Sequence, residues 1–395
     1  MKDMTNFLFY KVKYTPWLYS LYYTFGNLFI ALLSIFVRPK EKQILFSSFG
    51  GRKFDDSPKK IYDDMLNDSR FNDYDLVWAF HKPEKFDIPR GRKIKTDNIR
   101  YFITVLQSRV CITNSSVERG LHFKGRNNIL LNTWHGTPIK KMGLDIDDNN
   151  KSFRSKDGYS NIDIMLAQGE YEAKIFSQAF NMDYEKFKLI GLPRNDAFAN
   201  YTSQYVRDLK SRLHLPNKKI ILYAPTFREY DKTDSLTCRL SVPVDFDKWR
   251  QMLGEKYIVL FRAHYEISKS LDIKDNEFIR DVSAYPSLED LMIVADILVS
   301  DYSSIFFDFS IMDKPMICFA FDYAEYSSNR GLYFDIRKQI TSVSDEDALL
   351  KLLNDVAYNK SILTAQTRAF REKYVTAYGN ASQQSLNIIY DYLNK

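Results

Sequence analysis

Short apolar segments alternate with longer amphipathic segments along most of this chain. The apolar runs predict strands just after Lys42 and over residues 74–80, 109–115, 128–134, 162–169, 218–227, 257–264, 296–301 and 314–322. A helical periodicity predicts helices after Asp56 and over residues 100–108, 171–180, 202–215, 244–254, 287–295 and 302–312. Strands that alternate with helices in this way indicate a mostly parallel sheet covered by helices.

The two series of elements predict two doubly wound α/β halves that meet near Asn200, followed by a helical tail from Ser342 onward. A length of 395 residues also fits two globular domains better than one. In such sheets a ligand binds beyond the carboxyl ends of the strands, and a pair of domains adds a cleft. We therefore expect the functional residues directly after strands.

The N-terminal region departs from this alternation because residues 15–37 contain no charged residue. Basic residues flank it at Lys11, Lys13, Arg38, Lys40 and Lys42. The stretch is long enough to cross a bilayer, but Pro16, Gly26 and Asn27 interrupt it. Aromatic residues with basic flanks favour a helix that lies in the interface of an anionic membrane. A spanning helix and a buried helix of the first domain are the alternatives, and the lack of a small-residue cleavage site argues against a cleaved signal peptide.

Composition narrows the class of protein. The 27 Tyr and 29 Phe residues argue against a disordered or fibrous chain. Cys111, Cys238 and Cys318 lie in apolar surroundings without metal-ligand spacing, which indicates buried thiols in a reducing compartment. The formal charge of +6 is modest, and we expect no nucleic-acid partner.

Polar side chains follow four of the predicted strands, where the active site of an α/β protein is expected. These groups are His135-Gly136-Thr137, Thr226-Phe227-Arg228-Glu229, Arg262-Ala263-His264 and Asp301-Tyr302-Ser303-Ser304. Ser303 and Ser304 stand where a strand gives way to a helix, so that hydroxyls and free backbone N–H groups could bind a phosphate. The alternative is that Asp301 or Ser303 only caps the helix.

Two histidines are candidates for proton transfer. His135 ends an apolar run, and Gly136 permits a substrate to approach closely. A neutral imidazole there could take a proton from a hydroxyl, although a solvated basic turn is the alternative. Arg262 offers a diphosphate a fork of donors, and His264 could bond or protonate a phosphoryl oxygen or merely bond a nearby carbonyl. Neither a metal site nor a cofactor is predicted, because no cluster of ligand residues has suitable spacing.

Five ordered motifs resemble the CDP-glycerol glycerophosphotransferases of teichoic acid synthesis. They read NTWHGTPIKKMG, GLPRNDAF, ILYAPTFRE, FRAH and ADILVSDYSSIFFDFSIMDKPMICFAFDYAEY followed by RGLYFD. The resemblance extends from about Gln43 to the C-terminus. One departure is Tyr265, which stands where the family commonly has proline after the second histidine.

The resemblance implies a GT-B-like fold with three parts. Residues 1–42 would associate with the membrane, residues 43–200 would form the acceptor-side Rossmann-like domain, and residues 201–395 would bind CDP-glycerol, with a last helix that could pack on the first domain. The enzyme would work at the cytoplasmic face of the cell membrane as a peripheral or monotopic protein. Its oligomeric state, a homo-oligomer included, is left open.

The resemblance also implies a reaction. Glycerol phosphate would pass from CDP-glycerol to a hydroxyl of an undecaprenyl-diphosphate-linked acceptor, with release of CMP and without a cofactor. His135 would be the general base and His264 a second catalytic residue. The implied substrate contacts are Arg262, Ser303, Ser304, Thr226, Arg228, Arg330, Gly136, Thr137, Lys140 and Asp301. The short chain suggests a primase that adds one unit.

Several alternatives stay open at this point. Ribitol phosphate transferases and capsule polymer enzymes share these motifs. A GT-B glycosyltransferase that moves a sugar, and a lipid-surface protein without catalysis, are the more distant alternatives.

Overall fold

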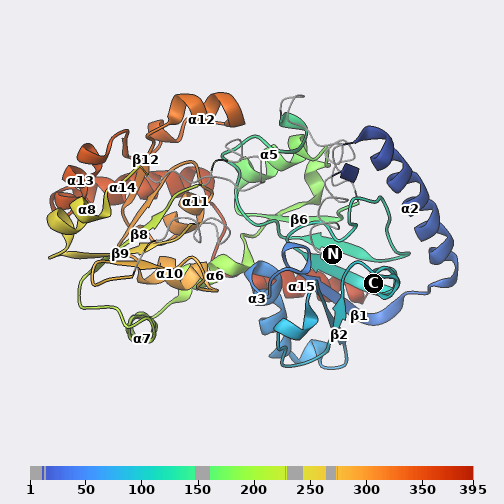
Figure 1. Ribbon diagram of the computed structural model, residues 1–395. Coiled ribbons are helices and arrows are strands. Elements are labelled where there is room, and N and C mark those ends of the chain that lie inside the picture. Colours follow the sequence, from blue (N-terminus) through green and yellow to red (C-terminus); the bar gives the residue numbers. More distant parts are fainter. Residues whose placement is uncertain are drawn as a thin grey trace. The chain divides into compact units, whose positions relative to one another are not determined.

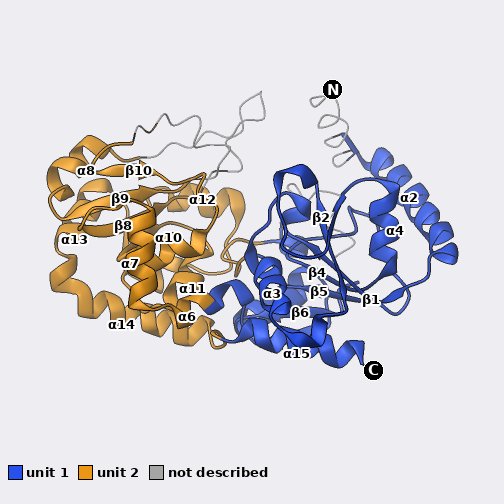
Figure 2. Ribbon diagram, turned by 90° about the horizontal axis from the view of Figure 1, so that it is seen from below, with its two compact units in different colours: residues 1–135, 142–196, 380–395 blue, residues 136–141, 197–379 orange. Residues whose placement is uncertain are grey.

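The computed structural model describes residues 11–12, 15–146, 161–226, 228, 243–263, 273 and 275–394. The chain divides into two compact units, each built around its own parallel sheet (Figures 1 and 2). Unit 1 comprises residues 1–135, 142–196 and 380–395, and unit 2 comprises residues 136–141 and 197–379. The predicted doubly wound α/β architecture is confirmed.

Unit 1 contains a seven-stranded sheet with the order β3-β2-β1-β4-β5-β6-β7. Its strands are β1 (Lys40–Ser47), β2 (Asp75–Phe80), β3 (Arg92–Lys95), β4 (Ser108–Thr113), β5 (Ile129–Asn132), β6 (Ile164–Ala167) and β7 (Phe187–Leu189). Its helices are α2 (Pro16–Phe36), α3 (Asp56–Leu66), α4 (Ile99–Gln107), α5 (Glu170–Ala179) and α15 (Ala381–Leu393). The strand order reverses between β1 and β4, and ligands of such sheets bind at this switch point.

Both faces of the central part of the unit 1 sheet are buried, which explains why the buried stretches of its central strands are apolar. Along β1, Leu45 packs into the core on one face, whereas Ile44 and Phe46 pack into the core on the other. In β2, Val77 and Trp78 are divided between the same two cores. Each face of a parallel sheet must be covered by helices, and successive side chains then alternate between two apolar layers.

Unit 2 contains a six-stranded sheet with the order β10-β9-β8-β11-β12-β13. Its strands are β8 (Lys219–Ala224), β9 (Tyr257–Phe261), β10 (Ile279–Asp281), β11 (Ile297–Ser300), β12 (Met316–Phe319) and β13 (Ser342–Val343). Its helices are α7 (Ser203–Arg212), α8 (Phe246–Leu253), α10 (Leu288–Val294), α11 (Ile305–Ser310), α12 (Tyr323–Arg330), α13 (Glu346–Asn354) and α14 (Val356–Tyr374), while α6 (Asp196–Asn200) begins at the boundary. The order reverses between β8 and β11, so the switch point of this sheet lies there.

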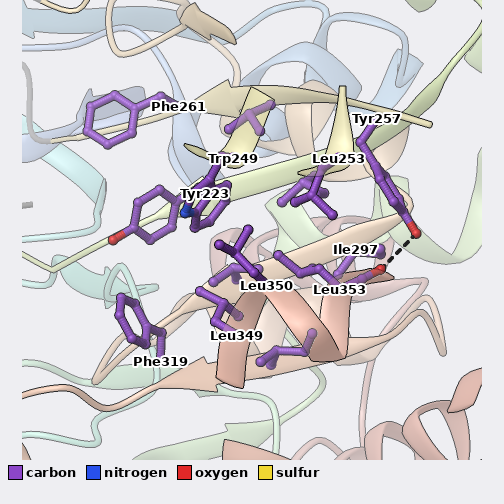
Figure 3. Packing of buried hydrophobic residues seen from close by; sticks show 14 of the residues in the cluster. Tyr223, Trp249, Leu253, Tyr257, Phe261, Ile297, Phe319, Leu349, Leu350 and Leu353 are labelled. Atoms are coloured by element: carbon purple, nitrogen blue, oxygen red, sulfur yellow. Dashed lines mark hydrogen bonds between the residues drawn. The ribbon is translucent and has the colours of Figure 1, made fainter. Parts of the chain in front are cut away.

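One core of unit 2 lies between the sheet and helices α8 and α13. Figure 3 shows Tyr223 and Phe261 of the sheet beside Trp249 of α8. At the edge of this core the Tyr257 hydroxyl donates to the carbonyl of Leu353 at 3.2 Å (Figure 3). Large aromatic side chains therefore fill the layer that supports the carboxyl ends of β8 and β9.

Helix α2 is continuous, although Gly26 and Asn27 were expected to interrupt it. Gly26 lies so close to Leu121 that an added Cβ would come within 2.5 Å of it. Asn27 accepts a hydrogen bond from the backbone N–H of His122 at 2.8 Å. Both residues therefore serve the packing of α2 on unit 1, where it runs along α4 (Figure 2).

The tail differs from its prediction in one respect. The residues directly after Thr341 form β13 at the edge of the sheet, and the helices follow it. The last helix, α15, belongs to unit 1, where Asp196 accepts the N–H groups of Ala381 and Ser382 at 2.8 Å each. These bonds satisfy the free amides at the helix N-terminus.

Candidate active site

His135 is the last residue of unit 1 before the chain enters unit 2. The predicted strand before it ends early, at Asn132, because Trp134 adopts a positive φ of 49°. Such a conformation is strained for a bulky residue, and strained residues cluster at functional sites. The turn buries the Trp134 ring against Phe180 while the side chain of His135 remains exposed.

The ring of His135 is held in one orientation and one tautomer. Its Nδ1 lies 2.7 Å from the backbone carbonyl of Asn114, which follows β4 at the switch point of unit 1. A carbonyl oxygen can only accept, so Nδ1 carries the proton and the neutral ring keeps its lone pair on Nε2. Trp134 stacks on the ring at 4.5 Å, and Phe49 lies at 5.4 Å.

Desolvation by the surrounding protein lowers the pKa of His135, and the bond to Asn114 opposes this shift. Part of the imidazole stays in contact with solvent, which limits how far burial can move its pKa. Because the pKa is lowered from its ordinary value of 6.5, the imidazole is neutral at pH 7. A neutral imidazole with Nε2 available has the properties of a general base.

The segment after His135, residues 136–141, is built into unit 2. Gly136 lies against Ser304, since an added Cβ would come within 2.6 Å of its Oγ. Thr137 and Ile139 are buried. The predicted contact Gly136 thus lies beside Ser304, one of the predicted phosphate-binding serines of the same unit.

The switch point of unit 2 brings together three of the predicted substrate contacts. Asp301, after β11, accepts hydrogen bonds from the backbone N–H and the hydroxyl of Thr226, which follows β8. Asp301 also accepts the N–H of Tyr302 at 2.7 Å and ion-pairs with Arg228 at 3.0 Å. Asp301 is 2% exposed, and its carboxylate holds together the segments that follow β8 and β11.

Arg228 lies at the centre of a buried charge network. Its guanidinium forms a forked pair with Asp322, at 2.6 and 2.9 Å, in addition to the pair with Asp301. The cation also lies over the rings of Tyr326 and Phe321, at 4.7 and 5.0 Å. Ion pairing overcomes desolvation and raises the pKa of Arg228, so the side chain is a fixed charge whose donors face protein groups.

Ser303 and Ser304 precede α11 and are both partly exposed. The Oγ of Ser303 accepts the N–H of Ile305 at 3.3 Å, which is a local turn, and Ser304 makes no capping bond through its side chain. Their hydroxyls lie at the carboxyl end of β11, next to the switch point.

The remaining predicted residues have different surroundings. Arg262 donates through Nη1 to the carbonyls of Val282 and Tyr285, at 3.1 and 2.8 Å. Arg330 donates through Nη1 to the carbonyl of Lys141 at 2.6 Å, and the ammonium of Lys140 lies 5.6 Å from the Tyr326 ring centre. His264, like Tyr265, lies outside the described residues.

Sequence reasoning missed Asn114 and Asp322, which fix His135 and Arg228. It also treated GLPRND only as a motif. In the structure Arg194 forms a buried ion pair with Asp56 at 3.1 Å, and Asn195 donates to Gln168 at 3.0 Å. Asp196 of the same motif caps α15. These bonds connect the motif to α3, to the end of β6 and to α15, so the motif has a structural role.

Known proteins resemble this chain over most of its length. Residues 30–391 match the family described as CDP-Glycerol:Poly(glycerophosphate) glycerophosphotransferase. The teichoic acid glycerol-phosphate transferase of Staphylococcus aureus is 30% identical over 374 residues, which cover 89% of this chain and 94% of that protein. The teichoic acid poly(glycerol phosphate) polymerase of Staphylococcus epidermidis is 31% identical over 368 residues, but these cover only 51% of the polymerase.

A solved structure gives the same assignment. A histidine-to-asparagine variant of the wall teichoic acid polymerase TagF, soaked with CDPG, aligns with a TM-score of 0.82 and 29% identity over 90% of each chain. The resemblance found in the sequence motifs is thereby confirmed. The chain belongs to the CDP-glycerol:poly(glycerophosphate) glycerophosphotransferase family and is a GT-B-like enzyme of that family.

Proposed function

We propose that this enzyme transfers glycerol phosphate from CDP-glycerol to a hydroxyl of a membrane-bound, undecaprenyl-diphosphate-linked acceptor. Family membership supports the donor and the reaction type. The observation that carries the mechanism is the bond from His135 Nδ1 to the carbonyl of Asn114, because it leaves Nε2 ready to accept a proton.

In the proposed reaction the acceptor hydroxyl attacks the glycerol-bearing phosphorus of CDP-glycerol. A new P–O bond forms to the acceptor, and the bond from this phosphorus to the bridging oxygen breaks. CMP leaves with the electron pair, and the hydroxyl proton passes to Nε2 of His135. A positioned base of this kind contributes roughly a hundred- to ten-thousand-fold in rate.

We assign the donor to the carboxyl edge of the unit 2 sheet. The hydroxyls of Ser303 and Ser304 adjoin the switch point between β8 and β11, where nucleotides bind in sheets of this order. Arg262 and His264 keep their proposed roles at the transferring phosphoryl group. Arg228 and Asp301 support this edge through their buried ion pair rather than through ligand contact.

Product mass tests the reaction. The protein is incubated with CDP-glycerol or CDP-ribitol and a soluble analogue of the lipid-linked disaccharide, and CMP release and product mass are measured. We expect CMP release with CDP-glycerol and one added glycerol phosphate, as for a primase. A ladder of products would indicate a polymerase, a ribitol product would overturn the donor, and transfer of a sugar from a nucleotide-sugar would overturn the reaction.

Substitution of His135 tests the mechanism. We expect His135→Ala to lower kcat by roughly a hundred- to ten-thousand-fold. His81→Ala is the matched control, because His81 is also an exposed histidine of unit 1. Among the ion pairs of the described residues, its side chain takes part in one, a 3.7 Å contact with Asp97. Nearly full activity of a folded His135→Ala protein would show that His135 is not the base.

Helix α2 supports attachment to a membrane. It is the one helix among the described residues that is long and apolar enough to cross a bilayer. One side is fixed to unit 1, where the Tyr22 hydroxyl donates to the carbonyl of Arg119 at 2.7 Å and Asn27 accepts from His122. The other side exposes large apolar residues, namely Trp17, Leu21, Phe25, Leu28, Phe29, Leu32, Ile35 and Phe36.

A helix whose polar contacts bind it to its own domain is better suited to lie in the interface than to span the bilayer. We therefore propose monotopic attachment at the cytoplasmic face. Replacing Trp17, Phe25 and Phe36 with serine should lower binding to anionic vesicles at least tenfold, since each buried side chain contributes about 1.5–3 kcal/mol. Tyr358→Ser is the control, because Tyr358 is an aromatic residue of unit 2 that is 88% exposed. Unchanged binding of the triple variant would refute a role for α2.

A further inference from the structure

Residues 330–333 hold the segment that follows His135. The backbone N–H of Lys141 donates to the carbonyl of Gly331 at 3.1 Å, and the N–H of Tyr333 donates to the carbonyl of Ile139 at 2.8 Å. Lys140 and Leu332 form an antiparallel bridge between these two bonds. The segment of residues 136–141 thus pairs with the chain that leaves α12, as a short extra strand would.

Arg330 completes this attachment through its side chain. It is the last residue of α12, and its Nη1 donates to the carbonyl of Lys141 at 2.6 Å. A charge-assisted bond of this length is stronger than a neutral one. Gly331 follows with a φ of +70°, and a Cβ there would come within 2.8 Å of the Lys141 side chain, so the close pairing requires glycine.

The other end of the segment is also fixed. Gly136 lies against Ser304 at the start of α11. Helix α12 is itself anchored, because the buried ring of Tyr326 stacks on Tyr302 with 4.3 Å between ring centres, and the guanidinium of Arg228 lies 4.7 Å from the Tyr326 ring. The segment is therefore attached to the same elements that form the carboxyl edge of the unit 2 sheet.

We propose that Arg330 is a positioning residue, which fixes residues 136–141 and through the peptide bond to Gly136 the placement of His135. This inference rests on the proposed role of His135 as the base. It replaces the earlier expectation that Arg330 contacts the donor. A misplacement of about 1 Å in a reacting group can cost roughly a hundredfold in rate, so a single bond far from the reacting atoms can control kcat.

The test compares Arg330→Met, which removes the donor and keeps the length of the side chain, with the wild-type enzyme. We expect kcat to fall roughly ten- to a hundredfold while KM for CDP-glycerol stays within about twofold. The pH at which kcat declines should not move, because the partners that act on the pKa of His135 by hydrogen bond or charge, namely Asn114, Asp56, Arg194 and Arg52, belong to unit 1. Arg330→Lys can still donate to the carbonyl of Lys141. The fall in log kcat for this variant should therefore be at most half of the fall for Arg330→Met.

Two further variants keep the test decisive. Gly331→Ala perturbs the same pairing without removing a charge, and we expect the same fall in kcat at unchanged KM. Arg368→Gln is the control, because Arg368 is exposed on α14 and, within the part of the chain that the structure describes, forms an ion pair only with Asp313. Thermal unfolding of each variant shows whether the protein is folded at the assay temperature.

The proposal would be overturned if Arg330→Met raised KM for CDP-glycerol tenfold or more at unchanged kcat, since Arg330 would then bind the donor. Unchanged kcat and KM in both Arg330→Met and Gly331→Ala would overturn the proposal as well. Failure of the proposed function gives a different result, because His135→Ala would then retain activity whatever the Arg330 variants do.

Discussion

Replacing Arg228 with methionine should destabilise unit 2 by about 3–5 kcal/mol. The guanidinium neutralises two carboxylates, those of Asp301 at 3.0 Å and Asp322 at 2.6 Å. The three side chains are 8%, 2% and 14% exposed, so water cannot replace the cation. Methionine preserves much of the packing against the aromatic rings but leaves both carboxylates without a counter-charge.

The magnitude follows from burial. An exposed ion pair contributes about 0–1 kcal/mol, whereas removal of one partner of a buried pair costs about 3–5 kcal/mol because an uncompensated charge remains. A domain is stable by only about 5–15 kcal/mol, so the loss is a large fraction of the total. With a urea dependence of about 2–3 kcal/mol per M, the unfolding midpoint of unit 2 should fall by roughly 1–2.5 M.

The assay is urea unfolding followed by tryptophan fluorescence, since Trp249 lies in the core of unit 2. Arg368→Met is the control, because its 3.4 Å pair with Asp313 is 55% exposed on the arginine side, and its midpoint should stay close to the wild-type value. Asp322→Asn in the Arg228→Met background should recover part of the loss, because one unpaired charge is removed. An Arg228→Met midpoint equal to that of the wild-type protein would refute the argument.

The remaining predictions concern His135, Gly136 and Asp196. Desolvation lowers the pKa of His135, so kcat should hold as pH falls to the ordinary imidazole value of 6.5 and decline only below it; a decline centred above 6.5 would contradict this assignment. Gly136→Ala would place a Cβ 2.6 Å from Oγ and 3.0 Å from Cβ of Ser304, and should lower kcat/KM roughly tenfold. A wild-type kcat/KM would show that the segment moves aside without loss of activity. Asp196→Ala removes the acceptor of two N–H groups at the start of α15 and should cost about 1–3 kcal/mol, seen as faster amide exchange in that helix; unchanged exchange would mean that packing alone holds it.

The central strands could be predicted from sequence because their burial makes them continuously apolar. Edge strands give a weaker signal. In β3, Arg92, Lys93, Ile94 and Lys95 alternate between partly buried and exposed positions, so charge obscures the strand. Only tertiary pairing with β2 defines it. Strand β13 has two residues, too few for any periodicity.

The candidate site was predictable only in part. His135 was found because it follows an apolar run, but its partner is the backbone carbonyl of Asn114, and a backbone contact leaves no mark on residue type. Arg228 was correctly placed after a strand, yet its carboxylate partners Asp301 and Asp322 stand 73 and 94 residues away in sequence. Sequence reasoning could not pair these charges before the order of the strands was known.

The motif HGTPIKK shows how one short stretch can serve several physical needs. His135 alone of its first residues is exposed, and it belongs to unit 1. Gly136 permits close approach to Ser304, and Thr137 to Ile139 are buried in unit 2. The backbone N–H of Lys141 takes part in the pairing with residues 330–333. A motif of this kind therefore determines the position of a segment as well as supplying its reactive group. For this reason we expect Gly331→Ala, which changes a residue outside the motif, to impair catalysis as a change within the motif would.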